Sequence, residues 1–84
     1  MTAPALVLVA HGSRDSRAAE VVERLSAACA AALPTPVLAS YLDHGSPTPV
    51  DALVSLADRG RTAIVAVPLL FAAAFHARVD LPRA

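Results

Sequence analysis

The period of the hydrophobic pattern changes four times along this chain and divides it into five segments. Short apolar runs at residues 5–10, 37–42 and 62–67 predict β-strands. The segments between them, from about Asp15 to Ala32 and from Thr48 to just before Gly60, carry apolar residues at helical spacing. Because the connections are short, the order strand, helix, strand, helix, strand predicts right-handed crossovers and a parallel sheet.

Each predicted helix has one apolar face that should pack on the sheet. In the first helix these positions are Ala18, Val21, Val22, Leu25, Cys29 and Ala32, with Glu20, Glu23 and Arg24 on the opposite face. In the second helix they are Val50, Leu53, Leu56 and Ala57. The third strand is nearly all apolar, so we expect it to be central and covered on both faces.

The ends of the second helix carry clear signals. Thr48 is the expected N-cap, Pro49 occupies the first helical position, and Asp51 completes a short capping box. Gly60 follows the predicted end of the helix.

Composition narrows the class of protein. The 84 residues suffice for one small domain, and seven Arg against seven acidic residues give a formal net charge of zero. This balance argues against nucleic acid or an anionic membrane as a partner.

The longest apolar stretch, 65–75, is interrupted by Pro68 and is shorter than the roughly 20 residues of a membrane span. No basic segment precedes the first strand, so we expect a cytoplasmic protein without a signal peptide. Cys29, the single cysteine, is expected to be a buried thiol.

Three polar side chains follow the three predicted strands. His11 opens the motif His-Gly-Ser-Arg-Asp-Ser, Asp43 follows the second strand, and His76 lies beyond the third. In a flavodoxin-like sheet of order 2-1-3 these residues would meet at the carboxyl edge, where ligands of open α/β sheets bind. Two imidazoles and a carboxylate suit a first-row divalent metal with open coordination positions.

Each of these residues also has a purely structural interpretation. His11 could be a turn histidine that bonds a nearby carbonyl, and His76 a satisfied loop histidine. Asp43 could initiate the loop through its side chain, with His44 as a solvated loop residue.

The carboxyl-terminal segment does not complete an element. Residues 68–75 are apolar, and Asp80 followed by Pro82 is typical of a helix start. We therefore expect residues 1–84 to form a single domain that is the amino-terminal βαβαβ part of a longer one, which would continue with a third helix and at least one more strand.

Four segments together resemble a known family. They are residues 10–15 (Ala-His-Gly-Ser-Arg-Asp), 41–43 (Tyr-Leu-Asp), 67–70 (Val-Pro-Leu-Leu) and 76–82 (His-Ala-Arg-Val-Asp-Leu-Pro). In order and spacing the chain is similar to the CbiX-type sirohydrochlorin chelatases, class II chelatases that insert cobalt or ferrous iron into sirohydrochlorin without a cofactor. The resemblance implies a three-layer chelatase-like fold, here truncated at its carboxyl-terminal end.

The resemblance also implies roles for individual residues. His11 and His76 would hold the metal, and Asp43 stands where the family usually has a glutamate. Ser13, Arg14, Arg17 and Arg78 are candidates to contact the tetrapyrrole, whose carboxylates suit arginine. The expected activity is a step of cobalamin or siroheme biosynthesis.

The expected assembly is a symmetric homodimer that buries Pro68 to Phe75 at least partly. The alternative function is a non-catalytic metal-binding or assembly module of the same fold.

Overall fold

The segments that the hydrophobic pattern marks as strands and helices take those structures in the computed structural model, which describes residues 3–69. The elements are β1 (Ala5–Ala10), α1 (Ser16–Ala32), β2 (Val37–Tyr41), α2 (Pro49–Asp58) and β3 (Ile64–Pro68). All five lie within two residues of their predicted bounds, and the largest shift at the start of a strand is that of β3, which begins two residues later than predicted.

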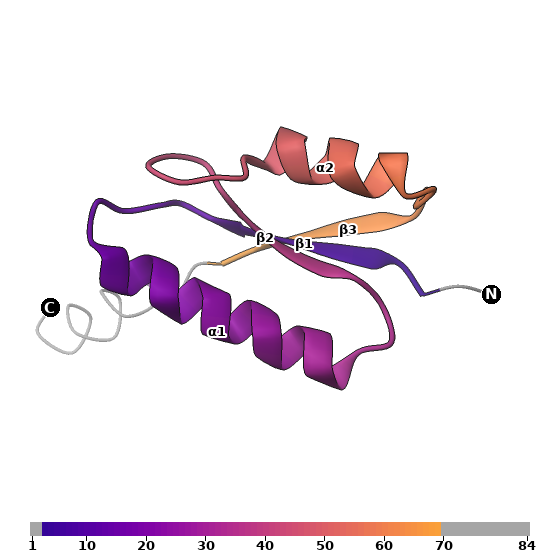
Figure 1. Cartoon of the computed structure of the whole chain (residues 1–84), viewed down its shortest axis with the longest axis horizontal. Coiled ribbons are helices and arrows are strands. Elements are labelled where there is room, and N and C mark those ends of the chain that lie inside the picture. Colours follow the sequence, from indigo (N-terminus) through magenta and orange to yellow (C-terminus); the bar gives the residue numbers. More distant parts are fainter. Residues whose placement is uncertain (1–2, 70–84) are drawn as a thin grey trace, which may run out of the picture.

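The three strands form one parallel sheet in the order β2-β1-β3. Leu8 of β1 is paired with Ala39 on one side and with Val67 on the other. The chain crosses from β1 to β2 through α1 and returns past β1 to β3 through α2, so the two helices lie on opposite faces of the sheet (Figure 1). The predicted α/β class and strand order are confirmed.

Capping side chains set where both helices begin. Asp15 is the N-cap of α1, and its carboxylate accepts a hydrogen bond from the backbone N–H of Arg17. Thr48 and Asp51 form the predicted capping box of α2, each side chain accepting from the other's backbone N–H at 3.2 Å. Each helix therefore begins at a defined residue, and some of the backbone N–H groups at its N-terminus have a side-chain hydrogen-bond partner.

Alternation along β1 divides the core into two layers. Ala5 and Val7 pack with Ala52 and Leu56 of α2 on one face of the sheet. On the other face, a second cluster consists of Ala10, Val22, Ala39 and Tyr41, with Leu69 packed against it. The second cluster lies at the carboxyl ends of the strands, so it forms the floor beneath the loop that begins with His11.

The packed face of α1 differs from the sequence prediction. In this helix the buried residues are Val22 and Ser26, while Val21 and Ala32 are exposed and Cys29 is only half-buried. The Cys29 thiol is therefore less buried than the sequence predicts. The reason is that α1 packs mainly over β2, so only a narrow stripe of small side chains meets the sheet.

The prediction for α2 is wrong at three of its four positions. Leu56 is buried as expected, but the other buried residue is Ala52, whereas Val50, Leu53 and Ala57 are exposed. Both faces of α2 are apolar, and its packing on β1 and β2 selects the stripe that contains Ala52 and Leu56. Hydrophobic spacing alone could not choose between two apolar faces.

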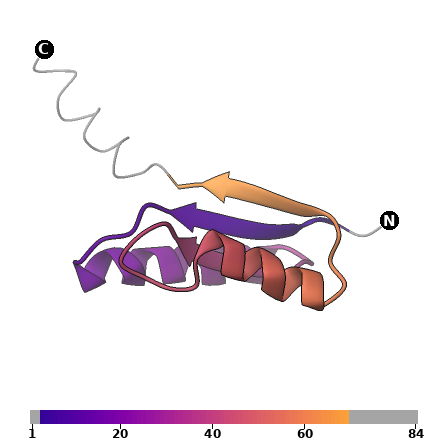
Figure 2. The ribbon, with the colours of Figure 1, turned by 90° about the horizontal axis from the view of Figure 1, so that it is seen from above.

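The third strand is not central among the described residues. Within residues 3–69, β3 pairs with β1 alone and forms one edge of the sheet, while both helices are displaced toward the opposite edge, at β2 (Figure 2). Val65 in the middle of β3 is 44% exposed. The apolar run predicts a strand that needs covering, but among the described residues only Ile64 of β3 packs against the core cluster that contains Ala52 and Leu56.

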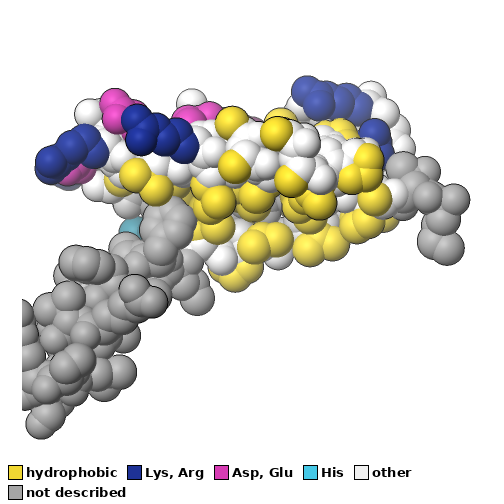
Figure 3. Space-filling model, turned by 90° about the horizontal axis from the view of Figure 1, so that it is seen from below, with side chains coloured by type: hydrophobic (Ala, Val, Ile, Leu, Met, Phe, Trp, Pro, Cys, Tyr) yellow, Lys and Arg dark blue, Asp and Glu magenta, His cyan; other side chains and the backbone are white. Residues whose placement is uncertain are grey.

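Figure 3 shows the distribution of charged and hydrophobic side chains on the surface that carries α1. Charged side chains gather along one border, and hydrophobic side chains occupy much of the remaining described surface. In the part of the chain that the structure describes, no helix has the length and apolar character needed to cross a membrane.

Candidate functional site

A cleft opens at the carboxyl edge of the sheet, between α1 and the loop that follows β2. Its volume is about 410 Å³, within the usual range of small-molecule pockets. The described residues that line it are Ala10, His11, Gly12, Ser13, Ala18, Ala19, Val22, Glu23, Tyr41, His44, Gly45, Ser46 and Leu69. Most of this surface is apolar, with a few polar groups at the rim.

His11 lies at the rim because β1 ends at Ala10 and the chain turns at once. Gly12 has φ of +101°, a left-handed conformation that favours glycine. The backbone N–H of Asp43 donates to the carbonyl oxygen of His11 at 3.0 Å, which continues the pairing of the two strands into their loops. The imidazole of His11 is exposed at the cleft.

Asp43 and His44 interact with each other in the loop after β2. The backbone N–H of His44 donates to Oδ1 of Asp43 at 2.9 Å, and Nε2 of His44 lies 3.5 Å from Oδ2. His44 has φ of +52°. This bond joins neighbouring residues and is not the contact two residues along the chain that defines an Asx turn, so both interpretations of Asp43 stay open. His44 lines the cleft, whereas Asp43 is not among the described residues that line it.

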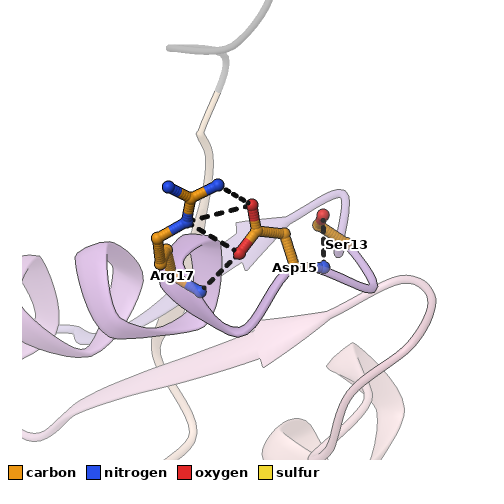
Figure 4. Close-up of polar contacts among 3 residues, drawn as sticks. All are labelled: Ser13, Asp15 and Arg17. Carbon is orange, nitrogen blue, oxygen red and sulfur yellow. Dashed lines mark hydrogen bonds and ion pairs between the residues drawn. The ribbon is translucent and has the colours of Figure 1, made fainter.

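At the start of α1, two of the predicted substrate contacts, Ser13 and Arg17, are hydrogen-bonded to Asp15 (Figure 4). Oγ of Ser13 accepts from the backbone N–H of Asp15, and Arg17 clasps the Asp15 carboxylate through Nε and a terminal nitrogen, the shortest contact being 2.8 Å. The side-chain hydrogen bonds of Arg17, and then its backbone N–H, hold the pKa of Asp15 below its usual value, while Asp15 raises the pKa of Arg17.

This arrangement changes the expectation for an anion at the helix start. The Asp15 carboxylate already occupies the positive end of α1 and neutralises Arg17, so a substrate carboxylate would have to compete with it. Arg14, which is exposed in the same loop, has no such partner among residues 3–69. The roles of Ser13, Arg14 and Arg17 toward a substrate stay predictions.

A hydrogen bond between Tyr41 and Glu23 joins the floor of the cleft to its α1 wall. The Tyr41 hydroxyl donates to Oε2 of Glu23 at 2.7 Å. Burial of the phenol, its hydrogen bond to Glu23 and the charge of that carboxylate raise the pKa of Tyr41 to about 12. The phenol is therefore neutral at physiological pH and is a fixed donor to Glu23.

The sequence pattern assigns Glu23 to the solvent face of α1 and gives Tyr41 no role. Helical spacing separates the faces of a helix, but it cannot show that one end of the polar face borders a cleft. A signal is present nonetheless, because a tyrosine at the carboxyl end of a buried strand needs a partner for its hydroxyl.

The described residues bring together only part of the predicted metal set. His11 and Asp43 are joined through their backbones, but within residues 3–69 no three His, Cys, Asp or Glu side chains are grouped as a metal site. His76 and Arg78 lie outside the described residues. The metal-ligand roles of His11, Asp43 and His76 stay predictions.

Three curated relatives match over most of this chain. A protein named sirohydrochlorin cobaltochelatase from Methanococcoides burtonii is 33% identical over 78 residues, which are 92% of this chain and 60% of that protein. Another of the same name, from Sulfolobus acidocaldarius, is 35% identical over 92% of this chain and 62% of its own length. A sirohydrochlorin ferrochelatase from Bacillus subtilis is 34% identical over 93% of this chain and 30% of its own.

The chain thus spans about 60% of the length of the two cobaltochelatases and less than a third of the ferrochelatase. No solved structure matches it. The family model that matches is CbiX, and the match runs over residues 5–84, which includes every described strand and helix. The motif residues that suggest the resemblance all fall within this match, and the chain belongs to the CbiX family.

Proposed function

We propose that this chain contributes to the insertion of a divalent metal, cobalt or ferrous iron, into sirohydrochlorin. The observation that carries the proposal is the cleft at the carboxyl edge of the sheet, with His11 at its rim, in a chain of the CbiX family. Relatives named as cobaltochelatases and a ferrochelatase support the same reaction. The pathway served is that of cobalamin or siroheme.

The reaction needs two kinds of surface. A divalent metal must exchange some of its waters for a protein ligand that leaves positions open for the ring nitrogens, and an imidazole ligand such as His11 provides this. A flat macrocycle needs an apolar wall. Ala18, Ala19 and Val22 of α1 offer one beside His11.

The insertion releases two protons from pyrrole nitrogens as the metal enters the ring. Asp43 is our candidate either for a third metal ligand or for the acceptor of these protons. His76 is the candidate for the second imidazole ligand, and Arg14, Arg17 and Arg78 are candidates for contacts to the substrate carboxylates. No cofactor is required beyond the metal that is itself a substrate.

The experiment is an insertion assay with the 84-residue chain, sirohydrochlorin and Co²⁺ or Fe²⁺, followed by the absorbance change of the macrocycle. We expect turnover by the parent chain and a loss of about 100-fold in His11→Ala, because the substitution removes the imidazole that holds the metal. His44→Ala removes another imidazole from the same cleft and should have a much smaller effect.

Two results would overturn the proposal. One is a His11→Ala variant that inserts metal at the parent rate. The other is a parent chain that binds Co²⁺ tightly yet forms no metal complex of sirohydrochlorin, which is the result expected of the alternative, a non-catalytic metal-binding module.

A further inference from the structure

Glu23 is the one formally charged side chain among the described residues that line the cleft, with histidines counted as neutral. The charge is negative. A negative wall attracts a divalent cation and repels a macrocycle that carries carboxylates, so it acts in opposite directions on the two proposed substrates.

A hydrogen bond from Tyr41 holds the carboxylate of Glu23 in place. Tyr41 donates to Oε2 at 2.7 Å, and Tyr41 itself is only 6% exposed and packs in the core cluster with Ala10 and Val22. Among residues 3–69 the second oxygen, Oε1, receives no hydrogen bond. One oxygen is therefore anchored while the other remains available to a ligand in the cleft.

The anchor also lies close to His11 in the fold. Tyr41 is the register partner of Ala10, and His11 is the next residue. Neighbouring strands are about 4.8 Å apart, so the backbone of Tyr41 lies beside that of Ala10. Glu23, Tyr41 and His11 all line the same cleft.

We propose that Glu23 is the cation-attracting residue of this cleft. It concentrates the divalent metal substrate beside His11, with Tyr41 as the residue that positions it, an inference that rests on the proposed function. Carboxylate oxygen is an acceptable ligand for divalent first-row cations, and a single carboxylate holds such an ion loosely enough to pass it on.

The test uses the full 84-residue chain and CoCl₂ as the probe, with binding measured by isothermal titration calorimetry at low and at physiological ionic strength. Glu23→Gln keeps the shape of the side chain and an oxygen that accepts from Tyr41, but removes the charge. Glu20→Gln is the matched control, because Glu20 lies on the same helix and is exposed like Glu23, but does not line the cleft.

We expect Glu23→Gln to weaken Co²⁺ binding about fivefold at low ionic strength, with a smaller difference at higher salt, as for one charge near an exposed ion. Glu20→Gln should change binding less than about twofold. Tyr41→Phe, which keeps the ring and removes the anchor, should weaken binding by an intermediate factor. In the insertion assay, Glu23→Gln should raise KM for Co²⁺ without raising KM for sirohydrochlorin.

Equal binding by the parent and Glu23→Gln would overturn the inference, and so would equal weakening by Glu20→Gln, which would indicate a general charge effect. A parent chain that does not bind Co²⁺ would overturn it as well. A parent that binds Co²⁺ but inserts none would refute the proposed function alone, since the binding comparison would still decide the role of Glu23.

Discussion

At Gly12 the loop after β1 lies directly against the backbone of the loop after β2. A Cβ at this position would overlap the carbonyl oxygen of Asp43, and the φ of +101° is unfavourable for any other residue. The glycine in the His-Gly motif is therefore required by the approach of the loop after β2, which in turn brings His44 to the cleft wall.

We predict that Gly12→Ala destabilises the fold by about 3 kcal/mol or more, because the strained backbone conformation and the clash with Asp43 add together. Gly60→Ala is the matched control, since Gly60 also has a positive φ, +82°, but a Cβ added there would meet no atom within 4 Å. That substitution should cost about 1 kcal/mol. Urea unfolding followed by circular dichroism measures both, and equal costs would show that the loops do not touch.

Tyr41 provides a spectroscopic readout because it is the only tyrosine and the chain has no tryptophan. We predict that its absorbance at alkaline pH titrates with a pKa of about 12, above the ordinary value of 10.0. In Glu23→Gln the pKa should fall but stay above 10.0, since burial, the largest cause, remains while the hydrogen bond to a carboxylate and its charge are lost. An unchanged pKa in this variant would contradict the Glu23–Tyr41 contact.

The same pKa has a consequence for stability. Because the folded-state pKa is raised, the folded protein binds more protons than the unfolded chain between pH 10 and 12. The contribution of Tyr41, about 2 to 3 kcal/mol, is fully present below pH 10 and is lost as the pH rises through about 12. Tyr41→Phe should flatten the dependence of unfolding free energy on pH in this window.

At the scale of elements, the position and type of each helix and strand could be predicted from sequence, whereas the packed faces could not. Thr48, Pro49 and Asp51 determine where α2 begins through contacts within a single helical turn, so the signal is local. The choice between Leu53 and Leu56 as the buried residue depends on where β1 and β2 lie, which no local pattern contains. The same distinction explains why the sequence offers His11 as a candidate site residue and does not offer Glu23.

We predict that Leu56→Ala, at a fully buried position, costs about 2 to 5 kcal/mol. Leu53→Ala, on the same helix at a residue that is 42% exposed, should cost less than about 1 kcal/mol. Thermal unfolding of the two variants compares these costs. A larger loss of stability in Leu53→Ala than in Leu56→Ala would show that α2 packs on the sheet through the face predicted from the hydrophobic spacing.

At the scale of the whole molecule, the described sheet has an uncovered edge. Among residues 3–69, β3 bonds to β1 only, and Val65 in the middle of this edge strand is 44% exposed. Such an edge favours association with another strand or another copy of the chain. The predicted homodimer would bury this edge together with the segment from Pro68 onward, most of which lies outside the described residues.

Sedimentation equilibrium at micromolar concentration tests this prediction. We expect the mass of a dimer, whereas a folded monomer throughout the concentration range would contradict it. Val65→Arg places a charge on the exposed face of β3 and should shift the equilibrium toward monomer, while Val50→Arg, on the exposed face of α2, is the control that should leave it unchanged.

The most direct test of the central claim, that His11 holds the metal substrate at the cleft, is the position of the metal itself. Crystals of the chain grown with Co²⁺ and measured at the cobalt absorption edge would locate it by anomalous scattering. We predict an anomalous peak at roughly 2.1 Å from an imidazole nitrogen of His11, as for a metal–histidine bond, within the cleft between α1 and the loop after β2. A strong peak elsewhere on the protein, with none beside His11, would contradict this claim.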